Sequence, residues 1–329
     1  MCKSVKRRPW MLGMALAGVC GLSLAAAAAG PGTTGADVLK VNLGARPNAL
    51  GGAYSAVGND VQSLLYNPAD LAGAQGSDAV FQHYAAFAEV TYELLGYAQP
   101  VEDMGIVGGT LVWRTMPPID NPGAPDAPVA VNDLVLTVGE GRLWKEWFGG
   151  GPAILDRLAV GGAAKIIYSS LREAHAVSLA ADLGAVWNSP ATWGLPVTVA
   201  AGLQNAGAPL RFLEQADPLP LCGRLGVSVV PWDTGRHKGL LTAECLLSVL
   251  DSGLTASVGA EYTLAKIIFF RAGYRFENAG NINGPSAGLG VAFMAGTLTF
   301  HLDYAYRVTL WDAYDSVDNN HFISLGVHF

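Results

Sequence analysis

Large apolar residues alternate with small or polar ones along most of the chain beyond its first quarter. In the segment 298–308, leucine, phenylalanine, tyrosine and valine occupy the even positions, while His301, Asp303 and Arg307 occupy odd ones. The last nine residues alternate in the same way and end on the aromatic Phe329. Because a period of two places the two sets of side chains on opposite faces of a β-strand, the pattern predicts an all-β protein.

Fourteen segments with this alternation can be delimited, and a single-chain bacterial barrel has an even number of strands. The predicted strands are 79–89, 91–101, 104–115, 133–145, 157–169, 174–187, 196–207, 222–232, 238–249, 254–265, 267–277, 285–296, 298–308 and 321–329. If both chain ends lie in the periplasm, most connections that face outward are long and most inward ones are short, which is the asymmetry of outer-membrane barrels. The connections at Val90 and 146–156 depart from this rule.

Composition separates a membrane barrel from a soluble β-sandwich, whose strands also alternate. Only 14% of the residues are charged and the mean hydropathy is +0.30, which is apolar for an exported soluble protein. Beyond the first 30 residues, no uninterrupted run of 18 apolar residues indicates a helical membrane span. Strands can cross lipid only as a closed barrel. We therefore expect a transmembrane antiparallel β-barrel of about 14 strands.

The first 29 residues have the pattern of a cleaved signal peptide. Lys3, Lys6 and two arginines precede an apolar run, and alanines follow it up to Ala29. A lipoprotein signal is disfavoured because Val19, rather than a small residue, precedes Cys20. The sequence thus predicts a signal peptide over 1–29 and a location in the bacterial outer membrane.

The segment 30–78 is rich in glycine and alanine and does not alternate. Asn59 or Asp60 can cap a short helix over 61–66, which Asn67-Pro68 would end. The segment could be a flexible periplasmic extension, but its apolar, small-residue character favours a plug packed in the lumen. We expect a plug over 30–78 and the barrel over 79–329.

Several short motifs in a fixed order resemble a known family. Gly44-Ala45-Arg46, Leu50-Gly51-Gly52-Ala53-Tyr54 and Tyr66-Asn67-Pro68-Ala69-Asp70-Leu71 resemble the N-terminal signature of the PorV/PorQ family, within the FadL-like outer-membrane group. Further matches run through the barrel to His321-Phe322-Ile323-Ser324-Leu325. The resemblance implies a fourteen-stranded barrel with an N-terminal plug.

The resemblance implies two functions. PorV-like members act in type IX secretion, where they bind exported proteins and shuttle them to the surface, and this transport or export function is our main expectation. FadL-like members take up long-chain fatty acids and other hydrophobic compounds, which is the alternative. The expected partners are outer-membrane lipids, the barrel assembly machinery, and either exported protein cargo or a hydrophobic small molecule. The net charge of −7 argues against nucleic acid.

Candidate site residues in the predicted plug are Arg46, Asp60 and the turn Asn67-Pro68-Ala69. Proline fixes φ and disfavours helix at the preceding residue, so this turn could act as a gate or merely shape the plug. Arg46 and Asp60 are candidates for ion pairs within the plug or to the wall, because a buried charge needs a partner. Phe329 is the candidate assembly signal.

Charged residues on the polar strand faces form the second candidate set. They could line a substrate path, but we favour a mutually paired network that fills the lumen. The set comprises Lys165, Asp182, Arg224, Glu244, Glu261, Arg271, Arg275, Asp303 and Arg307. Motifs of metalloproteases, serine hydrolases and Cys-x-x-Cys metal sites are absent from the sequence. We therefore expect neither an enzyme, nor a cofactor, nor a metal site.

The alternation also makes two predictions about strand register. A turn near residue 266 places Glu261 opposite Arg271 on the lumen face, where opposite charges attract. Cys222 falls on a lumen face and Cys245 on a lipid face. Opposite faces of adjacent strands do not meet disulfide geometry, so these two cysteines should not be bonded.

Overall fold

The structure is a computed structural model that describes residues 32–119, 128–190, 194–251, 253–278, 282–311 and 315–329. The predicted signal peptide, 1–29, lies outside the described residues.

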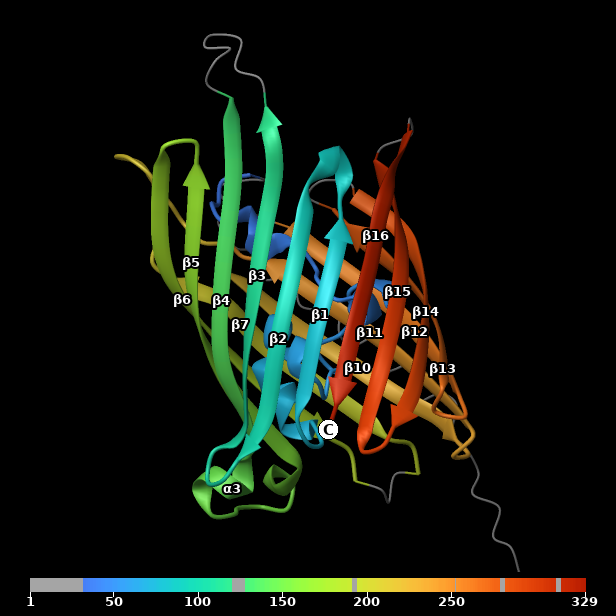
Figure 1. Ribbon diagram of the computed structural model, residues 1–329. Helices are drawn as coiled ribbons and strands as arrows, with labels where there is room; N and C mark the ends of the chain where they lie inside the picture. The colour runs from blue at the N-terminus through green and yellow to red at the C-terminus, as the bar shows by residue number, and fades with distance from the viewer. Residues whose placement is uncertain (1–31, 120–127, 191–193, 252, 279–281, 312–314) are drawn as a thin grey trace, which may run out of the picture.

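The chain forms a closed antiparallel barrel of fourteen strands, in which β1 pairs with β16 to complete the wall (Figure 1). This confirms the predicted fold class. The barrel strands are β1 (Asp78–Ala85), β2 (Thr91–Val101), β3 (Gly105–Ile119), β4 (Val129–Leu143), β5 (Leu158–Leu171), β6 (Ala174–Asn188), β7 (Val197–Gly207), β10 (Cys222–Asp233), β11 (His237–Ser248), β12 (Gly253–Leu264), β13 (Ile268–Glu277), β14 (Ile282–Ala295), β15 (Leu298–Trp311) and β16 (Asp315–His328).

A few short elements depart from the sequence prediction. The predicted strand 79–89 stops at Ala85, because Ala88 and Glu89 adopt left-handed backbone conformations in the short 3₁₀ helix η4 (Phe87–Glu89). The predicted connection 146–156 overlaps α3 (Trp144–Phe148) and η5 (Leu155–Arg157). Two small strands, β8 (Leu210–Arg211) and β9 (Ala216–Asp217), pair within the connection between β7 and β10.

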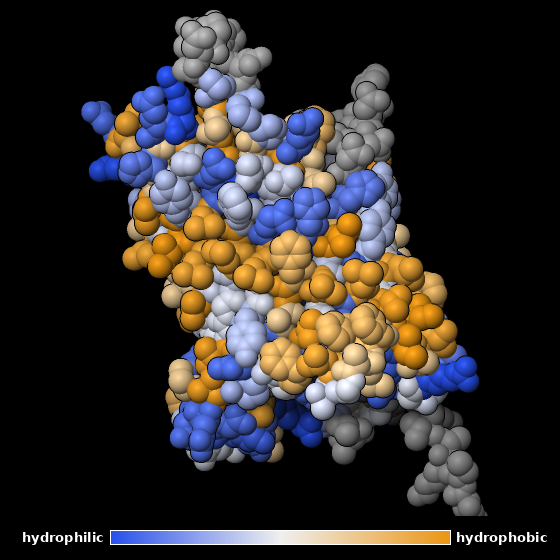
Figure 2. All heavy atoms as spheres, in the orientation of Figure 1, coloured by the Kyte–Doolittle hydropathy of each residue, from blue (hydrophilic) through white to orange (hydrophobic). Residues whose placement is uncertain are grey.

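The strand faces separate as the alternation predicts. In β12, Thr255 and Glu261 point into the lumen and are buried, whereas Leu254 and Val258 point outward and are 39% and 44% exposed. Apolar side chains form a band across the middle of the molecule, and hydrophilic side chains gather toward both ends (Figure 2). Such a band is where lipid contacts a barrel. Among the described residues, no helix is both long and apolar enough to cross a membrane.

The N-terminal segment runs through the lumen as a plug of four short helices. These are η1 (Asp37–Lys40), α2 (Ala45–Ala49), η2 (Val61–Leu65) and η3 (Pro68–Gly73). The helix predicted over 61–66 is thus the 3₁₀ helix η2, with Asp60 as its N-cap residue. α2 packs against β13 to β16, η2 against β1 to β4, and η3 against β3 to β6.

The plug spans the barrel from end to end. We call the end that carries the connections 86–90 and 208–221 the loop end, and the end where β1 starts and β16 stops the terminal end. At the loop end, the Gly35 amide donates to the Pro218 carbonyl at 2.9 Å. At the terminal end, Ser77 and Phe329 exchange two backbone hydrogen bonds of 2.8 and 3.0 Å.

The expectation that both chain ends lie in the periplasm concerns an N-terminus that lies outside the described residues, and it stays a prediction. The first described residues lie at the loop end, opposite to Phe329. Strand alternation fixes which residues face the lumen, but it carries no information about where a preceding non-alternating segment enters it.

Candidate functional site: a plugged lumen

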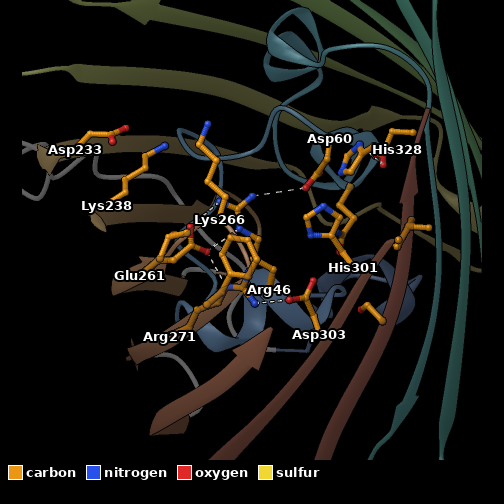
Figure 3. A pocket seen from close by; sticks show the side chains of 17 residues that line it. Arg46, Asp60, Asp233, Lys238, Glu261, Lys266, Arg271, His301, Asp303 and His328 are labelled. Atoms are coloured by element: carbon orange, nitrogen blue, oxygen red, sulfur yellow. Dashed lines mark hydrogen bonds and ion pairs between the residues drawn. The ribbon is translucent and has the colours of Figure 1, made fainter. Parts of the chain in front are cut away.

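A chain of buried charges fixes α2 to the wall. Arg46 makes a bidentate contact with Glu261, at 2.9 Å from Nε and 3.1 Å from Nη2. Glu261 also accepts a 2.6 Å hydrogen bond from Arg271, which in turn contacts Asp303 at 2.5 Å. Figure 3 shows these side chains converging on Arg46 from the strands. The predicted pairing of Glu261 with Arg271 is confirmed by this contact and by their direct register.

The two candidate plug charges also approach each other. Arg46 Nη1 lies 3.9 Å from Asp60 Oδ2, and the Tyr54 hydroxyl donates to the same carboxylate. Burial raises the pKa of the Tyr54 hydroxyl well above its usual range, and the charge of Asp60 adds to this. Tyr54 therefore stays protonated and holds Asp60 in place. Arg46 thus pairs with the wall and within the plug.

A second set of lumen charges holds the middle of the plug. Glu244 accepts the backbone amides of Tyr54 and Ser55 at 3.1 and 2.8 Å and also pairs with Arg224. Arg224 Nε donates to Gln204 at 2.6 Å. The Glu244 carboxylate thus pairs with Arg224 and also accepts hydrogen bonds from two plug amides that lie outside the helices.

The neighbouring pair Lys165–Asp182 is organised by a β-bulge. Between β6 and β7 the register shifts by one residue, which brings Gln204 and Asn205 together into the lumen. Lys165 Nζ then contacts Asp182 at 2.6 Å and Asn205 Oδ1 at 2.7 Å. All nine predicted lumen charges lie on inward-facing positions, and the described contacts give most of them a partner, as in the filled-lumen interpretation.

The turn Asn67-Pro68-Ala69 is buried against the inner wall, as predicted. Asn67 Nδ2 donates to the carbonyls of Ala185 on β6 and Ala201 on β7, at 3.3 and 3.4 Å. Its Oδ1 accepts the amide of Ala69 at 3.1 Å, which caps η3. The amide side chain thus joins the start of η3 to two strands. A gating role for the turn stays a prediction.

Inward-facing glycines make room for the plug, and sequence reasoning missed them. A Cβ on Gly161 would lie 2.5 Å from the amide nitrogen of Ala69, and one on Gly184 would lie 1.8 Å from Asn67 Oδ1. A Cβ on Gly273 would lie 2.2 Å from the amide nitrogen of Gly51. These glycines share the parity of the polar residues in their strands. Glycine recurring at lumen parity was the signal that could have located the plug surface.

The plug divides the lumen into separate cavities. A polar inner cavity of about 370 Å³ opens toward the terminal end and is shown in Figure 3. Its walls carry charges of both signs, including Asp60, Glu261, Lys266 and His328. Toward the loop end, two outer cavities of about 230 and 250 Å³ lie on either side of Lys40.

The larger outer cavity is lined by more cationic than anionic side chains. Lys40, Arg275 and Arg307 face it with Glu277. Arg275 pairs with Glu277 at 2.7 Å. Arg307 donates to Asn48 Oδ1 at 3.1 Å and stacks over the ring of Phe322. In the described part of the chain, Arg307 has no carboxylate within ion-pair distance.

The remaining sequence predictions concern Cys222, Cys245 and Phe329. The two cysteines, both within described strands, form no disulfide, and they lie on opposite faces as predicted. Phe329 follows β16 and is 52% exposed, and its ring lies 6.3 Å from that of Tyr97. Its role in assembly stays a prediction. Over the described ranges, no group of three His, Cys, Asp or Glu side chains is arranged to hold a metal ion.

The fold and the lumen together define a plugged transmembrane β-barrel. No protein-family model matches the sequence, and no curated protein matches it. The structure is similar to the CymD monoaromatic hydrocarbon channel, with a TM-score of 0.57 and 12% identity over 87% of this chain and 96% of that one. It is equally similar to the toluene transporter TbuX of Ralstonia pickettii, with a TM-score of 0.57 and 11% identity over 87% and 97%.

A FadL homologue of Pseudomonas aeruginosa is a third similar structure, with a TM-score of 0.52 and 11% identity over 87% of this chain and 96% of that one. At these identities the likeness concerns the fold. It extends over nearly the full length of each of these three proteins.

Proposed function

We propose that the protein is a bacterial outer-membrane transport barrel that admits small molecules with a hydrophobic body, and that the plug controls their passage. The observation that carries this proposal is the plug spanning the lumen between outer and inner cavities. The shared fold of hydrocarbon channels and transporters supports hydrophobic compounds as the substrate class. Outer-membrane barrels have their longer loops outside the cell, so we place the loop end outside and the terminal end in the periplasm.

The outer cavity favours substrates that also carry an anionic group. Among the described side chains, Arg275 and Lys40 have carboxylate partners, whereas Arg307 contacts the Asn48 amide oxygen, the Tyr84 hydroxyl and the Phe322 ring. A buried or half-buried cation gains from a carboxylate that hydrogen-bonds it. The carboxylate of a long-chain fatty acid would pair with Arg307, whereas a neutral hydrocarbon carries no group that could do so.

Uptake by cells tests the proposal. The protein is expressed in a host that lacks its own uptake barrel, and entry of a radiolabelled fatty acid and of toluene is compared with cells carrying an empty vector. Both should enter faster. Arg307→Gln, which keeps a donor for Asn48, should slow the fatty acid and leave toluene unchanged. If neither compound enters faster, small-molecule transport is wrong.

Protein export of the PorV type would need a different surface. A barrel that binds secreted cargo should expose contiguous apolar area at the loop end. In the described parts of the loop-end connections, the exposed large apolar side chains are Phe87 and Leu213. Loss of a secreted protein from the cell surface after deletion of the barrel, with unchanged solute uptake, would favour export instead.

A further inference from the structure

The connection between β4 and β5 holds the longest terminal-end structure outside the strands. It contains α3, a glycine turn and η5, and it projects beyond the strands at the lower end of Figure 1. None of its side chains lines any of the lumen cavities described above. Residues 144–157 therefore take no part in the plugged lumen.

The segment packs against the outer wall of the barrel. In β6, outward-facing side chains occupy odd positions, as the exposure of Val177, Leu179 and Leu183 shows. Trp187 has the same parity, and its indole Nε1 donates to the carbonyl of Ile154 at 3.0 Å. The turn before η5 is therefore held on the face that is continuous with the apolar band.

Large apolar side chains of the segment remain exposed. Trp147, Phe148 and Ile154 are 42%, 57% and 61% exposed. The Phe148 ring packs against that of Trp144, with 4.1 Å between ring centroids and 30° between the ring planes. Met104, in the adjoining turn between β2 and β3, is also exposed. A folded protein gains by covering such groups, and a bilayer edge covers them when they lie at its depth.

The charged residues of the segment are compatible with lipid head groups. Lys145 and Arg157 are exposed, as are the acidic Glu146 and Asp156, and Arg157 Nη1 uses one donor on the Ser189 carbonyl at 3.3 Å. The remaining donors are available to lipid phosphates. Aromatic rings are the side chains that outer-membrane barrels place at the two interfaces of the bilayer.

We propose that residues 144–157 form an interfacial anchor, in which Trp147, Phe148 and Ile154 insert into the phospholipid leaflet at the terminal end. The argument for lipid as the occupant is continuity, because Trp187 ties the segment to the lipid-facing side of β6. The anchor sets the depth of the barrel in the membrane on the side of β4 to β6. It does not depend on what the barrel transports.

A fluorescent label tests the depth of the segment. Phe148→Cys and, on the same helix, Glu146→Cys are each labelled with an environment-sensitive dye, and the full-length protein is reconstituted in vesicles of phosphatidylethanolamine and phosphatidylglycerol. Cys222 and Cys245 are buried, and the protein without an introduced cysteine gives their background labelling. Quenching by aqueous iodide is compared with quenching by lipids that carry a shallow spin label.

At position 148 the label should be quenched by the spin-labelled lipid and be several-fold less accessible to iodide than at position 146. Trp147→Cys and Ile154→Cys should behave like position 148, and they replace it if that variant does not fold. Equal iodide access at positions 146 and 148 would overturn the proposal. Shielding from both quenchers would also overturn it, because it would place a protein or a second copy over the segment.

Discussion

At the residue scale, the plug is held in the lumen by carboxylates that each bind more than one partner. Glu261 binds Arg46 of the plug and Arg271 of the wall, and Glu244 binds Arg224 and two plug amides. The sequence predicted that these charges face inward and that Glu261 pairs with Arg271. It could not predict the contacts to the plug, because they join residues 189 to 215 positions apart in the chain.

The substitution Glu261→Gln should therefore destabilise the protein strongly. Two guanidinium groups would face a neutral amide, and breaking a buried ion pair on one side costs about 3–5 kcal/mol. Urea unfolding in detergent, followed by tryptophan fluorescence, measures this loss. Glu173→Gln is the matched control, because the Glu173 side chain is 90% exposed and should cost almost nothing. A loss for Glu261→Gln as small as that of the control would contradict the prediction.

The anchoring of the first described residues should depend on pH. Partial burial raises the pKa of Asp251, but hydrogen bonds from Thr34 and Lys40 outweigh this and hold the pKa below the ordinary 3.8. Burial lowers the pKa of Lys40, but Asp37 and Asp251 outweigh this and raise it above the ordinary 10.5. A lowered carboxyl pKa stabilises the contact above the ordinary value, and a raised lysine pKa stabilises it below.

The contact should thus be intact between roughly pH 4 and 10 and weaken outside this window. A spin label on Gly32→Cys, an exposed position with open space around it, reports the mobility of the segment. The left-handed backbone of Gly32, with φ of 79°, strains a cysteine there, so every protein compared carries the same Gly32→Cys change. Mobility should rise as the pH falls through the pKa of Asp251. With Asp251→Asn it should be high at neutral pH already and show no acid step. An unchanged spectrum in that variant would mean that Asp251 does not hold the segment.

At the element scale, the strands were predictable and the plug surface was not. The twelve predicted strands other than 79–89 and 321–329 have both ends within four residues of the observed ones, since alternation reports directly on the two faces of a barrel wall. The predicted strand 321–329 was too short, because β16 already starts at Asp315. The strand 79–89 was too long, because its alternation continues into a left-handed turn at Ala88. Inward glycines look like weak strand positions in a sequence, yet Gly161 and Gly184 are where η3 touches the wall.

Gly161→Ala should displace η3 from β5. The new Cβ would lie 2.5 Å from the Ala69 nitrogen and 2.6 Å from the Pro68 carbonyl carbon, and backbone cannot move aside as a flexible side chain can. Overpacking of this kind costs about 1–3 kcal/mol. Gly162→Ala is the control, because its Cβ would face outward with its nearest neighbour at 3.7 Å. Urea unfolding of both variants measures the difference, and equal stabilities would mean that η3 does not sit tightly on β5.

At the scale of the whole molecule, the sequence predicted a plugged barrel but not the path of the plug through the lumen. The plug runs from the Pro218 contact at the loop end to the Phe329 contact at the terminal end. Its residues use side chains of most strands as partners, so no local pattern reveals the path. The barrel wall, in contrast, is specified strand by strand, and its closure needs only the pairing of β1 with β16.

Because the wall strands pair with one another independently of the plug, the effect of deleting residues 37–75 can be predicted. The barrel should still insert, because strand pairing and the outward apolar faces are unaffected, but the lumen should lose the elements that separate its inner and outer cavities. Single-channel recordings in planar bilayers should then show larger currents than the full-length protein gives. Glu261, which pairs with Arg46 of the plug, would then be hydrated, as would other lumen charges. The ion selectivity of the open pore should therefore depend on salt concentration.

Heat-modifiable migration on gels serves as the control that the truncated protein is a folded barrel. Equal currents from folded full-length and truncated protein would mean that the segment does not close the pore. If neither form conducts at all, wall side chains seal the lumen, and transport would then require a route that does not follow the barrel axis. Larger currents, together with uptake only by the full-length protein, would show that the plug selects the substrate as well as blocking the pore.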